Sequence, residues 1–400
     1  MKALFPLLTI TLLCVVACTT TNTIAPKPIE ISSDFAQRTT DFSFDFLKTL
    51  NKEEKPEKNF FVSPLGLHMA LGMLMNGSAT SSEEELMKTL KLEGLSLADV
   101  NANYLKLIDG LPLVDSKVTN TLANSVWQDI NFNTESSYLE TLKKSFKAQL
   151  YQENFALAGT VDKINKWASD NTNAKIEKVL DQISPDQVMF LINALYFKGD
   201  WANQFDVENT YKATFSGLNE SGQIDMMSKR DTFAFADMID YKMAELTYGS
   251  GQYSMVLVLP SNDKTLDGII ENMNTSSWEE DLKKLRVQKI DLEIPKIKME
   301  YSVKLNEVLA KMGMPSLFTS AADLSKISPP AGKLQVGFVK QDSFVEIDEK
   351  GTEAAAVTTI GIEVTSVPNY PRFVCNKPFL FFIREKSSNT IQFVGKIVNL

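Results

Sequence analysis

The segment 344–373 is the feature that most constrains the fold. It opens with a β-prone run at Phe344, Val345 and Ile347. From Gly351 to Thr359 it holds only small or β-branched residues, apart from one charge at Glu353. Proline would remove a ladder donor, and the first one comes only at residue 368, so nothing earlier forbids a strand. A loop that can become a strand is a candidate conformational switch.

The composition is that of an ordinary globular protein, since 44% of the 400 residues are hydrophobic and 23% are charged. Length alone allows one to three domains. The formal net charge is −9, and the sequence has no basic stripe of the kind that binds nucleic acid. We therefore expect no nucleic-acid partner.

Residues 1–17 have the pattern of a lipoprotein signal peptide. The apolar stretch 3–17 is too short to span a bilayer as a mature helix. It ends in Val-Val-Ala-Cys, which resembles a bacterial lipobox with Cys18 as the lipidated residue; an ordinary secretory signal is the alternative. We expect residues 18–33 to be a lipidated tether, and the protein to be exported and anchored to a bacterial membrane. Thr19, rather than Asp, after Cys18 resembles the sorting signal for the outer membrane.

One cysteine remains once Cys14 leaves with the signal and Cys18 carries lipid. It is Cys375, in a predicted strand, and we interpret it as a buried structural thiol rather than a reactive one. An exported chain without an intramolecular disulfide must rely on its hydrophobic core, which this length permits.

Helices dominate the first half of the chain and strands the second, but the two kinds of element interleave. One α+β domain over residues 34–400 therefore fits better than two domains. Apolar periodicity predicts helices over 34–50, 61–75, 138–150, 161–180 and 303–312. It predicts strands over 120–127, 187–198, 253–259, 289–297, 379–384 and 391–397.

Catalytic chemistry is scarce in this sequence. A Ser/His/Asp or Cys/His hydrolase would have to use the single histidine, His68, which lies in an apolar run and reads better as a core residue. A zinc site of His and Cys ligands is excluded by count. The carboxylates Glu346, Asp348 and Glu349 invite an acid/base interpretation, but nothing nearby completes such a site. We expect no catalytic residue, metal or cofactor, which points towards a binder or an inhibitor.

An ordered set of motifs resembles the serpin family from about residue 34 to Leu400. The motifs that carry the resemblance are Asn59–Pro64 (NFFVSP), Ile164–Trp167 with Thr172 and Lys175–Ile176, Asn193–Trp201 (NALYFKGDW), Leu259–Pro260, Gly313–Met314, Phe318, Ala322–Asp323, Glu349–Ala356 (EKGTEAAA), Asn376–Phe379 (NKPF) and Phe393–Lys396 (FVGK). One such motif would be weak, but the ordered set is highly specific.

This resemblance implies a fold with about three β-sheets, eight to nine helices and an exposed reactive-centre loop at about 350–373. It also implies a monomeric inhibitor whose partners are proteases. The protease cleaves the loop, the loop inserts into the main sheet as a strand, and the covalent acyl-enzyme is carried along and distorted. The inhibitory hinge falls on Glu349, Gly351, Thr352, Glu353, Ala354, Ala355 and Ala356.

The hinge residues pass a physical test of this implication. An inserted strand alternates its faces with a period of two. With Thr352 inward, the inward set continues through residues 354, 356 and 358 and stays small, while Glu353 faces solvent. A slip of one residue would bury Glu353, which is costly.

Family spacing from Gly351 places the scissile bond at Thr365–Ser366. Counting back from residue 376 suggests Val367 instead, but Pro368 would follow that bond and hinder cleavage. We favour Thr365, with Val364 as a neighbouring alternative. Small β-branched residues suit elastase-like and subtilisin-like proteases, and Val364 would suit a papain-like protease.

The resemblance also implies a polar network that controls opening of the main sheet. Ser63 and Asn193 match it, and Trp201 closes the motif that contains Asn193. Gly66 replaces a family serine and Gln341 replaces a family histidine. We expect the Gln341 amide to bond Asn193 and to replace part of the imidazole's function.

Three functions compete on the sequence alone. The leading one is a lipid-anchored protease inhibitor, and the second is a non-inhibitory binding lipoprotein with the same fold. The third is a hydrolase, which would need His68 in a surface cleft.

Overall fold

The structure is a computed structural model that describes residues 27–261, 263–328, 334–352 and 370–400. Nine α-helices lie in these ranges: α1 (Ser33–Glu53), α2 (Pro64–Met75), α3 (Thr80–Thr89), α4 (Leu97–Gly110), α5 (Ser136–Ser145), α6 (Gly159–Asn171), α7 (Leu266–Asn272), α8 (Thr275–Lys284) and α9 (Asn306–Met312).

The described strands form two hydrogen-bonded sheets. The six-stranded sheet has the order β10 (Ile297–Lys304), β11 (Lys340–Ile347), β12 (Gly351–Thr352), β4 (Met189–Asp200), β2 (Val118–Asp129), β3 (Gln149–Glu153). The nine-stranded sheet has the order β1 (Phe60–Val62), β15 (Thr390–Ile397), β14 (Phe379–Glu385), β8 (Tyr253–Pro260), β7 (Tyr241–Tyr248), β6 (Ser221–Asp237), β9 (Arg286–Pro295), β13 (Arg372–Val374), with β5 (Tyr211–Ser216) paired to β6.

The α+β class expected from the sequence is confirmed. The expected three sheets correspond to these two because the long strand β6 joins parts that would otherwise separate. Its last four residues, 234–237, pair with β7, residues 226–235 pair with β9, and residues 221–226 pair with β5.

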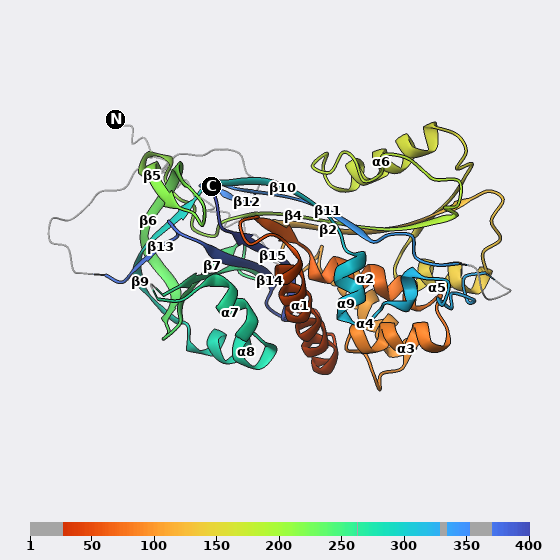
Figure 1. Ribbon diagram of the computed structural model, residues 1–400. Helices are drawn as coiled ribbons and strands as arrows, with labels where there is room; N and C mark the ends of the chain where they lie inside the picture. Colours follow the sequence, from red (N-terminus) through yellow and green to blue (C-terminus); the bar gives the residue numbers. More distant parts are fainter. Residues whose placement is uncertain (1–26, 262, 329–333, 353–369) are drawn as a thin grey trace, which may run out of the picture.

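The six-stranded sheet is covered on both faces (Figure 1). On one face it packs against α6, where Trp127, Phe190 and Ala194 meet Ile164 and Trp167 of the helix. The other face joins the main core, which includes α1, α2 and the strands β14 and β15. The sheet is therefore a layer between α6 and the rest of the molecule.

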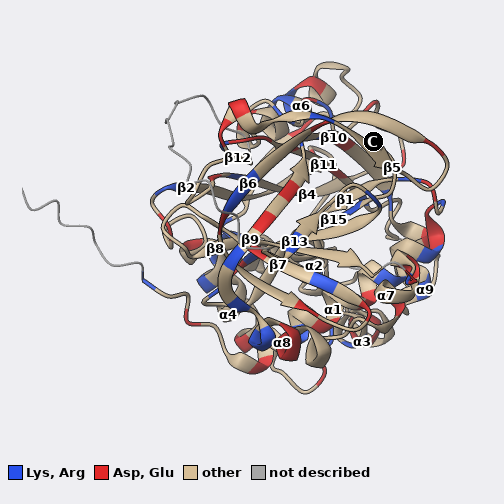
Figure 2. Cartoon of the chain, turned by 90° about the vertical axis from the view of Figure 1, so that its left-hand side faces the viewer, with Lys and Arg blue, Asp and Glu red and all other residues tan. Residues whose placement is uncertain are grey.

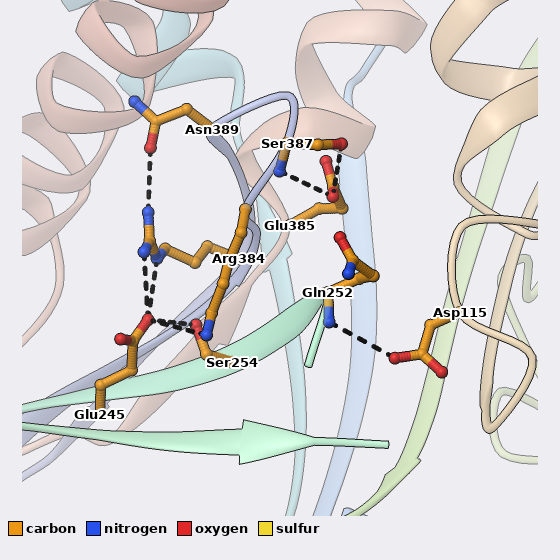
Figure 3. A network of polar contacts seen from close by, with 9 residues as sticks. Asp115, Glu245, Gln252, Ser254, Arg384, Glu385, Ser387 and Asn389 are labelled. Carbon is orange, nitrogen blue, oxygen red and sulfur yellow. Dashed lines mark hydrogen bonds and ion pairs between the residues drawn. The ribbon is translucent and has the colours of Figure 1, made fainter. Parts of the chain in front are cut away.

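A polar network joins three neighbouring strands within the nine-stranded sheet (Figure 3). Arg384 Nη2 lies 3.1 Å from Glu245 Oε1, which also accepts a hydrogen bond from Ser254 Oγ at 2.6 Å. These residues tie β14, β7 and β8 together. Burial would raise the pKa of Glu245, but the neighbouring Arg384 and Lys386 outweigh it and lower the pKa.

The sequence located most elements but misplaced several ends. The predicted helix 138–150 stops at residue 145, and residues 149–153 pair with β2 as β3 instead. The predicted strand 289–297 is divided at Lys296 into β9 and β10, which belong to different sheets. Within the described ranges, no helix is long and apolar enough to span a bilayer.

Residues 27–33, which we assigned to the tether, are not free of the domain. Ile29 is buried against Gly110, and its N–H donates to Ser387 Oγ at 2.9 Å. Ser32 caps α1 by accepting from the Phe35 N–H. Ile31 also packs against the main core, so residues 27–33 lie against the domain through two apolar side chains.

Candidate functional site

The short strand β12 holds the first residues of the predicted hinge between two strands of the six-stranded sheet. Gly351 and Thr352 pair antiparallel with Asp200 and Gly199 of β4, and Thr352 also pairs antiparallel with Ile347 of β11. Strands β4 and β11 thus run parallel to each other with one hinge strand started between them. Beyond this point, no rung joins β4 directly to β11 among the described residues.

Thr352 points into the molecule, on the face that the alternation argument predicts. Its side chain is 4% exposed, and its hydroxyl lies 2.7 Å from the Tyr248 hydroxyl. The Tyr248 ring stacks on Trp201 with centroids 4.4 Å apart. The first inserting position is therefore a small, closed and hydrogen-bonded pocket.

The turn before β12 is held by backbone contacts that leave little space. Asp348 Oδ1 accepts from the N–H groups of Lys350 and Gly351, at 2.9 and 3.2 Å. The indole N–H of Trp201 donates to the Asp348 carbonyl at 2.9 Å. A Cβ on Gly351 would lie 2.1 Å from the Gly199 carbonyl oxygen, so only glycine fits this close approach.

Glu349 lies at the same turn and is 5% exposed. Its carboxylate accepts from Lys296 Nζ at 2.9 Å and from Thr210 Oγ1 at 2.7 Å. Burial would raise the pKa of Glu349, but these hydrogen bonds outweigh it and hold the pKa below the ordinary value. The carboxylate is therefore ionised and fully engaged at neutral pH.

A narrow gap continues from Thr352 between β4 and β11. Leu195 and Phe197 line it on the β4 side, and Phe344 and Glu346 line it on the β11 side. The segment after α6 covers it with Thr172, Lys175 and Ile176, and the nine-stranded sheet contributes Ile383 and Phe393. The free volume is about 20 Å³, which is space for a single water molecule. A strand can enter here only if β4 and β11 separate.

Ser63 and Gln341 meet at the far end of this gap. Gln341 Oε1 accepts from the Ser63 N–H at 2.8 Å, and Gln341 Nε2 donates to the Ser63 carbonyl at 2.9 Å. The prediction that the Gln341 amide bonds Asn193 is wrong. Asn193 Nδ2 instead donates to Asn124 Oδ1 at 2.8 Å. The sequence could not predict this partner, because it shows which side chains are present but not which backbone groups they contact.

Gly66, where the resemblance implies a serine, lies close to the side chains of Asn193 and Ser63. A Cβ at this position would lie 2.7 Å from Asn193 Oδ1 and 3.0 Å from Ser63 Oγ. Ser63 Oγ instead accepts from the Gly66 N–H and donates to the Gln392 carbonyl, at 3.0 and 2.7 Å.

The chain that follows the predicted loop is fixed on β9. Strand β13 pairs in parallel with Asp291–Glu293, and Arg372 Nη2 lies 2.9 Å from Glu293 Oε1. Basic and acidic residues both occur along β6 and β9 on this side of the molecule (Figure 2). One such pair is Arg230 with Asp291, at 2.5 Å.

Several predicted residues lie outside the described residues. They are Cys18, the hinge residues Glu353, Ala354, Ala355 and Ala356, and the candidate reactive residues Val364, Thr365, Ser366 and Val367. Their roles stay predictions. The structure does bring Glu349, Gly351, Thr352 and Trp201 together, and it places Ser63, Asn193 and Gln341 as a second group along the gap.

The hydrolase hypothesis requires His68 in a surface cleft, and the structure does not place it there. His68 is fully buried, with Nε2 3.1 Å from the Leu90 carbonyl and Nδ1 2.7 Å from the Tyr104 hydroxyl. Burial lowers its pKa to about 4. The carboxylates Glu346 and Glu349 are engaged with lysines, and no group of three metal-ligating side chains occurs in the part of the chain that the structure describes.

Comparisons with known proteins agree with this architecture. The family model described as "Serpin (serine protease inhibitor)" matches residues 37–400. Human Serpin B4 is 31% identical over 388 residues, covering 91% of this chain and 99% of that protein. Leukocyte elastase inhibitor of Xenopus laevis is 34% identical over 371 residues, covering 89% and 97%. The crystal structure of a thermophilic serpin, tengpin, in the native state aligns with a TM-score of 0.85 at 28% identity, covering 93% and 95%.

This chain therefore belongs to the serpin family. Serpins are mainly protease inhibitors rather than catalysts, and their target proteases are bound covalently.

Proposed function

We propose that this protein is a suicide-substrate inhibitor of serine endopeptidases, and also of papain-like cysteine endopeptidases. The single observation that carries the proposal is the position of β12. The hinge residues Gly351 and Thr352 already occupy the entrance between β4 and β11, in a register that one antiparallel strand can continue.

The register of β12 supports insertion of the whole hinge. Counting onwards from Thr352, the inward residues Ala354 and Ala356 would face Phe197 and Leu195 on β4. These two β4 side chains line the gap, so only small inserted residues fit beside them. The outward residue Glu353 would remain on the opposite face of the sheet.

The bait in this proposal is Thr365–Ser366, with Val364 and Val367 as the alternatives. Elastase-like and subtilisin-like proteases suit these small β-branched residues, and papain-like proteases suit Val364. The name of the Xenopus relative, leukocyte elastase inhibitor, is in line with an elastase-like target.

We further propose that Cys18 carries a lipid that attaches the domain to a bacterial membrane, with the outer membrane as the location. The support is the lipobox and Thr19. Residues 19–28 would then span the distance between the lipid and the anchoring side chain of Ile29.

The test mixes the domain, starting at residue 27, with an elastase-like, a subtilisin-like and a papain-like protease. We expect a complex that survives SDS, together with a released peptide whose mass identifies the bond cut. The matched control is Thr365→Pro, which should abolish cleavage by the elastase-like enzyme at that bond. Cleavage of the wild-type loop by all three enzymes without any SDS-stable complex would instead support a binding lipoprotein.

A further inference from the structure

One surface of β6 and β9 faces outwards and takes no part in the proposed strand insertion (Figure 2). The register places Arg230, Thr232 and Ala234 of β6 opposite Asp291, Lys289 and Val287 of β9. The residues between them, such as Phe233, Ile290 and Leu292, are buried, so these six point away from the core. Val287 is 77% exposed, and Lys289 and Arg230 are exposed as well. We call these six residues the outer face.

Tyr370 lies against the basic residues of the outer face, at the point where the described chain resumes. The centre of its ring is 5.2 Å from Lys289 Nζ and 5.5 Å from the guanidinium carbon of Arg230. Asp291 fixes Arg230 in turn, accepting from Nε at 2.5 Å and from Nη2 at 3.3 Å. A cation over an aromatic ring is attracted by the negative face of the ring. These contacts order the outer face before any partner binds.

The excess charge on the outer face is positive. The carboxylates that follow Lys289 on β9 are both paired with arginines, Asp291 with Arg230 and Glu293 with Arg372. Lys289 has no acidic partner in the part of the chain that the structure describes. The whole chain carries a formal charge of −9, so the outer face differs in sign from the molecule around it.

The proposed bait determines what comes close to the outer face. Thr365 precedes Tyr370 by five residues, and five residues span at most about 17 Å. Only the length of the intervening chain enters this limit, whatever its path. A globular domain of about 200 residues is about 40 Å across, so its surface extends about 20 Å to either side of a central cleft. A protease bound at Thr365–Ser366 therefore has its surface within reach of Tyr370 and Lys289.

We propose that the outer face, together with Tyr370, is a secondary docking surface for the target protease. The inference rests on the proposed function, because it needs the loop to be cut near Thr365. The positive charge of Lys289 fits a protease that is acidic beside its cleft, and Val287 and Tyr370 offer it apolar contact. Tyrosine and arginine are frequent among the residues that carry binding energy at interfaces, and complementary charge raises the association rate. The surface selects among proteases that accept the same bait residues.

Reversal of one charge separates docking from net charge. Lys289→Glu should slow the attack of an acidic protease on the loop by about five- to tenfold at low salt, and by less at high salt. Lys143→Glu is the matched control, because it makes the same change in charge at an exposed lysine of α5, at the opposite end of the molecule (Figure 1). It should change the rate by less than about twofold. Val287→Ser should slow the attack by about threefold at both salt concentrations, because the contact it removes is apolar.

The experiment measures the second-order rate constant at which a protease consumes the intact loop of the full-length protein. Two elastase-like or subtilisin-like proteases are used, one of acidic and one of basic isoelectric point, and the released peptide is weighed to identify the bond cut. We expect Lys289→Glu to slow the acidic protease and not the basic one. The number of inhibitor molecules consumed per protease trapped should stay unchanged, because the outer face takes no part in strand insertion.

The possible failures are distinguishable. Equal effects of Lys289→Glu and Lys143→Glu would overturn the docking surface and leave the inhibitor function intact. Cleavage of the wild type without an SDS-stable complex would overturn the inhibitor function, whereas the ratio of the two cleavage rates would still decide the docking surface. If neither protease cuts the loop at a bond within reach of Tyr370, the docking surface is wrong.

Discussion

The two sheets of this molecule differ in how completely their strands are paired and covered. In the nine-stranded sheet, β8 and β15 are buried at every residue and paired on both sides. In the six-stranded sheet, the central strand β4 is largely half-buried and is paired to β12 over only two residues. We call the nine-stranded sheet the finished sheet. We call the six-stranded sheet the incomplete sheet because, of the described residues, only Gly351 and Thr352 lie between β4 and β11. The difference shows where this fold can still gain hydrogen bonds and burial.

The largest expected effect is at the entrance to the incomplete sheet. Thr352→Arg would place a charged side chain in a pocket where Thr352 is 4% exposed and bonded to Tyr248. Burying an unpaired charge costs several kcal/mol, so the hinge cannot seat and the protein becomes a substrate. The measurement is the yield of SDS-stable complex per loop cleaved. Thr352→Ser keeps the hydroxyl and should behave as the wild type. Stable complexes with Thr352→Arg would show that the facing of Thr352 is irrelevant to insertion.

In the finished sheet, truncating a core side chain should destabilise the native and loop-cleaved forms alike. Phe381 on β14 is fully buried, and its ring lies 5.7 Å from that of Phe61. Phe381→Ala is expected to lower the free energy of unfolding by about 3–5 kcal/mol. Because this sheet is already complete, the native and loop-cleaved forms should lose the same amount. Denaturant unfolding of both forms checks this, with Phe381→Leu as the milder control. If only one form lost stability, the finished sheet would also change on loop cleavage, and the two sheets would not differ in this way.

A smaller effect is expected where the gap ends at Gln341. Gln341→Ala removes two hydrogen bonds to the Ser63 backbone and should destabilise the closed sheet by about 2 kcal/mol. Spontaneous loop insertion and polymerisation should then become faster, as measured by native gels during incubation. Gln341→Met keeps the side-chain volume without the bonds, so it should match the alanine variant. If neither variant changes these rates, Gln341 does not control the opening of the sheet.

The inward facing of Thr352 could be predicted from the sequence because its signal is local. Small residues after Gly351, one charge and alternation sufficed to orient Thr352, and burial in the structure agrees. The partner of Gln341 could not be predicted in the same way, because it is the backbone of a residue 278 positions away. Ile29 was missed because two apolar side chains, Ile29 and Ile31, form too short a pattern to show a period. The number of sheets was ambiguous for a related reason: pairing of four residues at the end of β6 joins two of them.

The smallest effect concerns the residue that joins the two sheets. Glu349 precedes β12, while Lys296 lies between β9 and β10 and Thr210 precedes β5, so their hydrogen bonds link the incomplete sheet to the finished one. The pKa of Glu349 is lowered in the folded protein. The stabilisation is therefore complete above the unfolded pKa of about 4.3, and it is lost as the pH falls through the lower folded value.

Glu349→Gln should accordingly reduce the free energy of unfolding by about 1 kcal/mol at neutral pH, and the difference from the wild type should disappear in acid. Denaturant unfolding across this pH range measures both. Lys296→Met, which removes the partner, should reproduce the loss at neutral pH, whereas Lys212→Met on β5 should not. A difference between Glu349→Gln and the wild type that persists in acid would assign the contact to packing rather than charge. The contact between the two sheets would then depend on the packing of the Glu349 side chain and not on its charge.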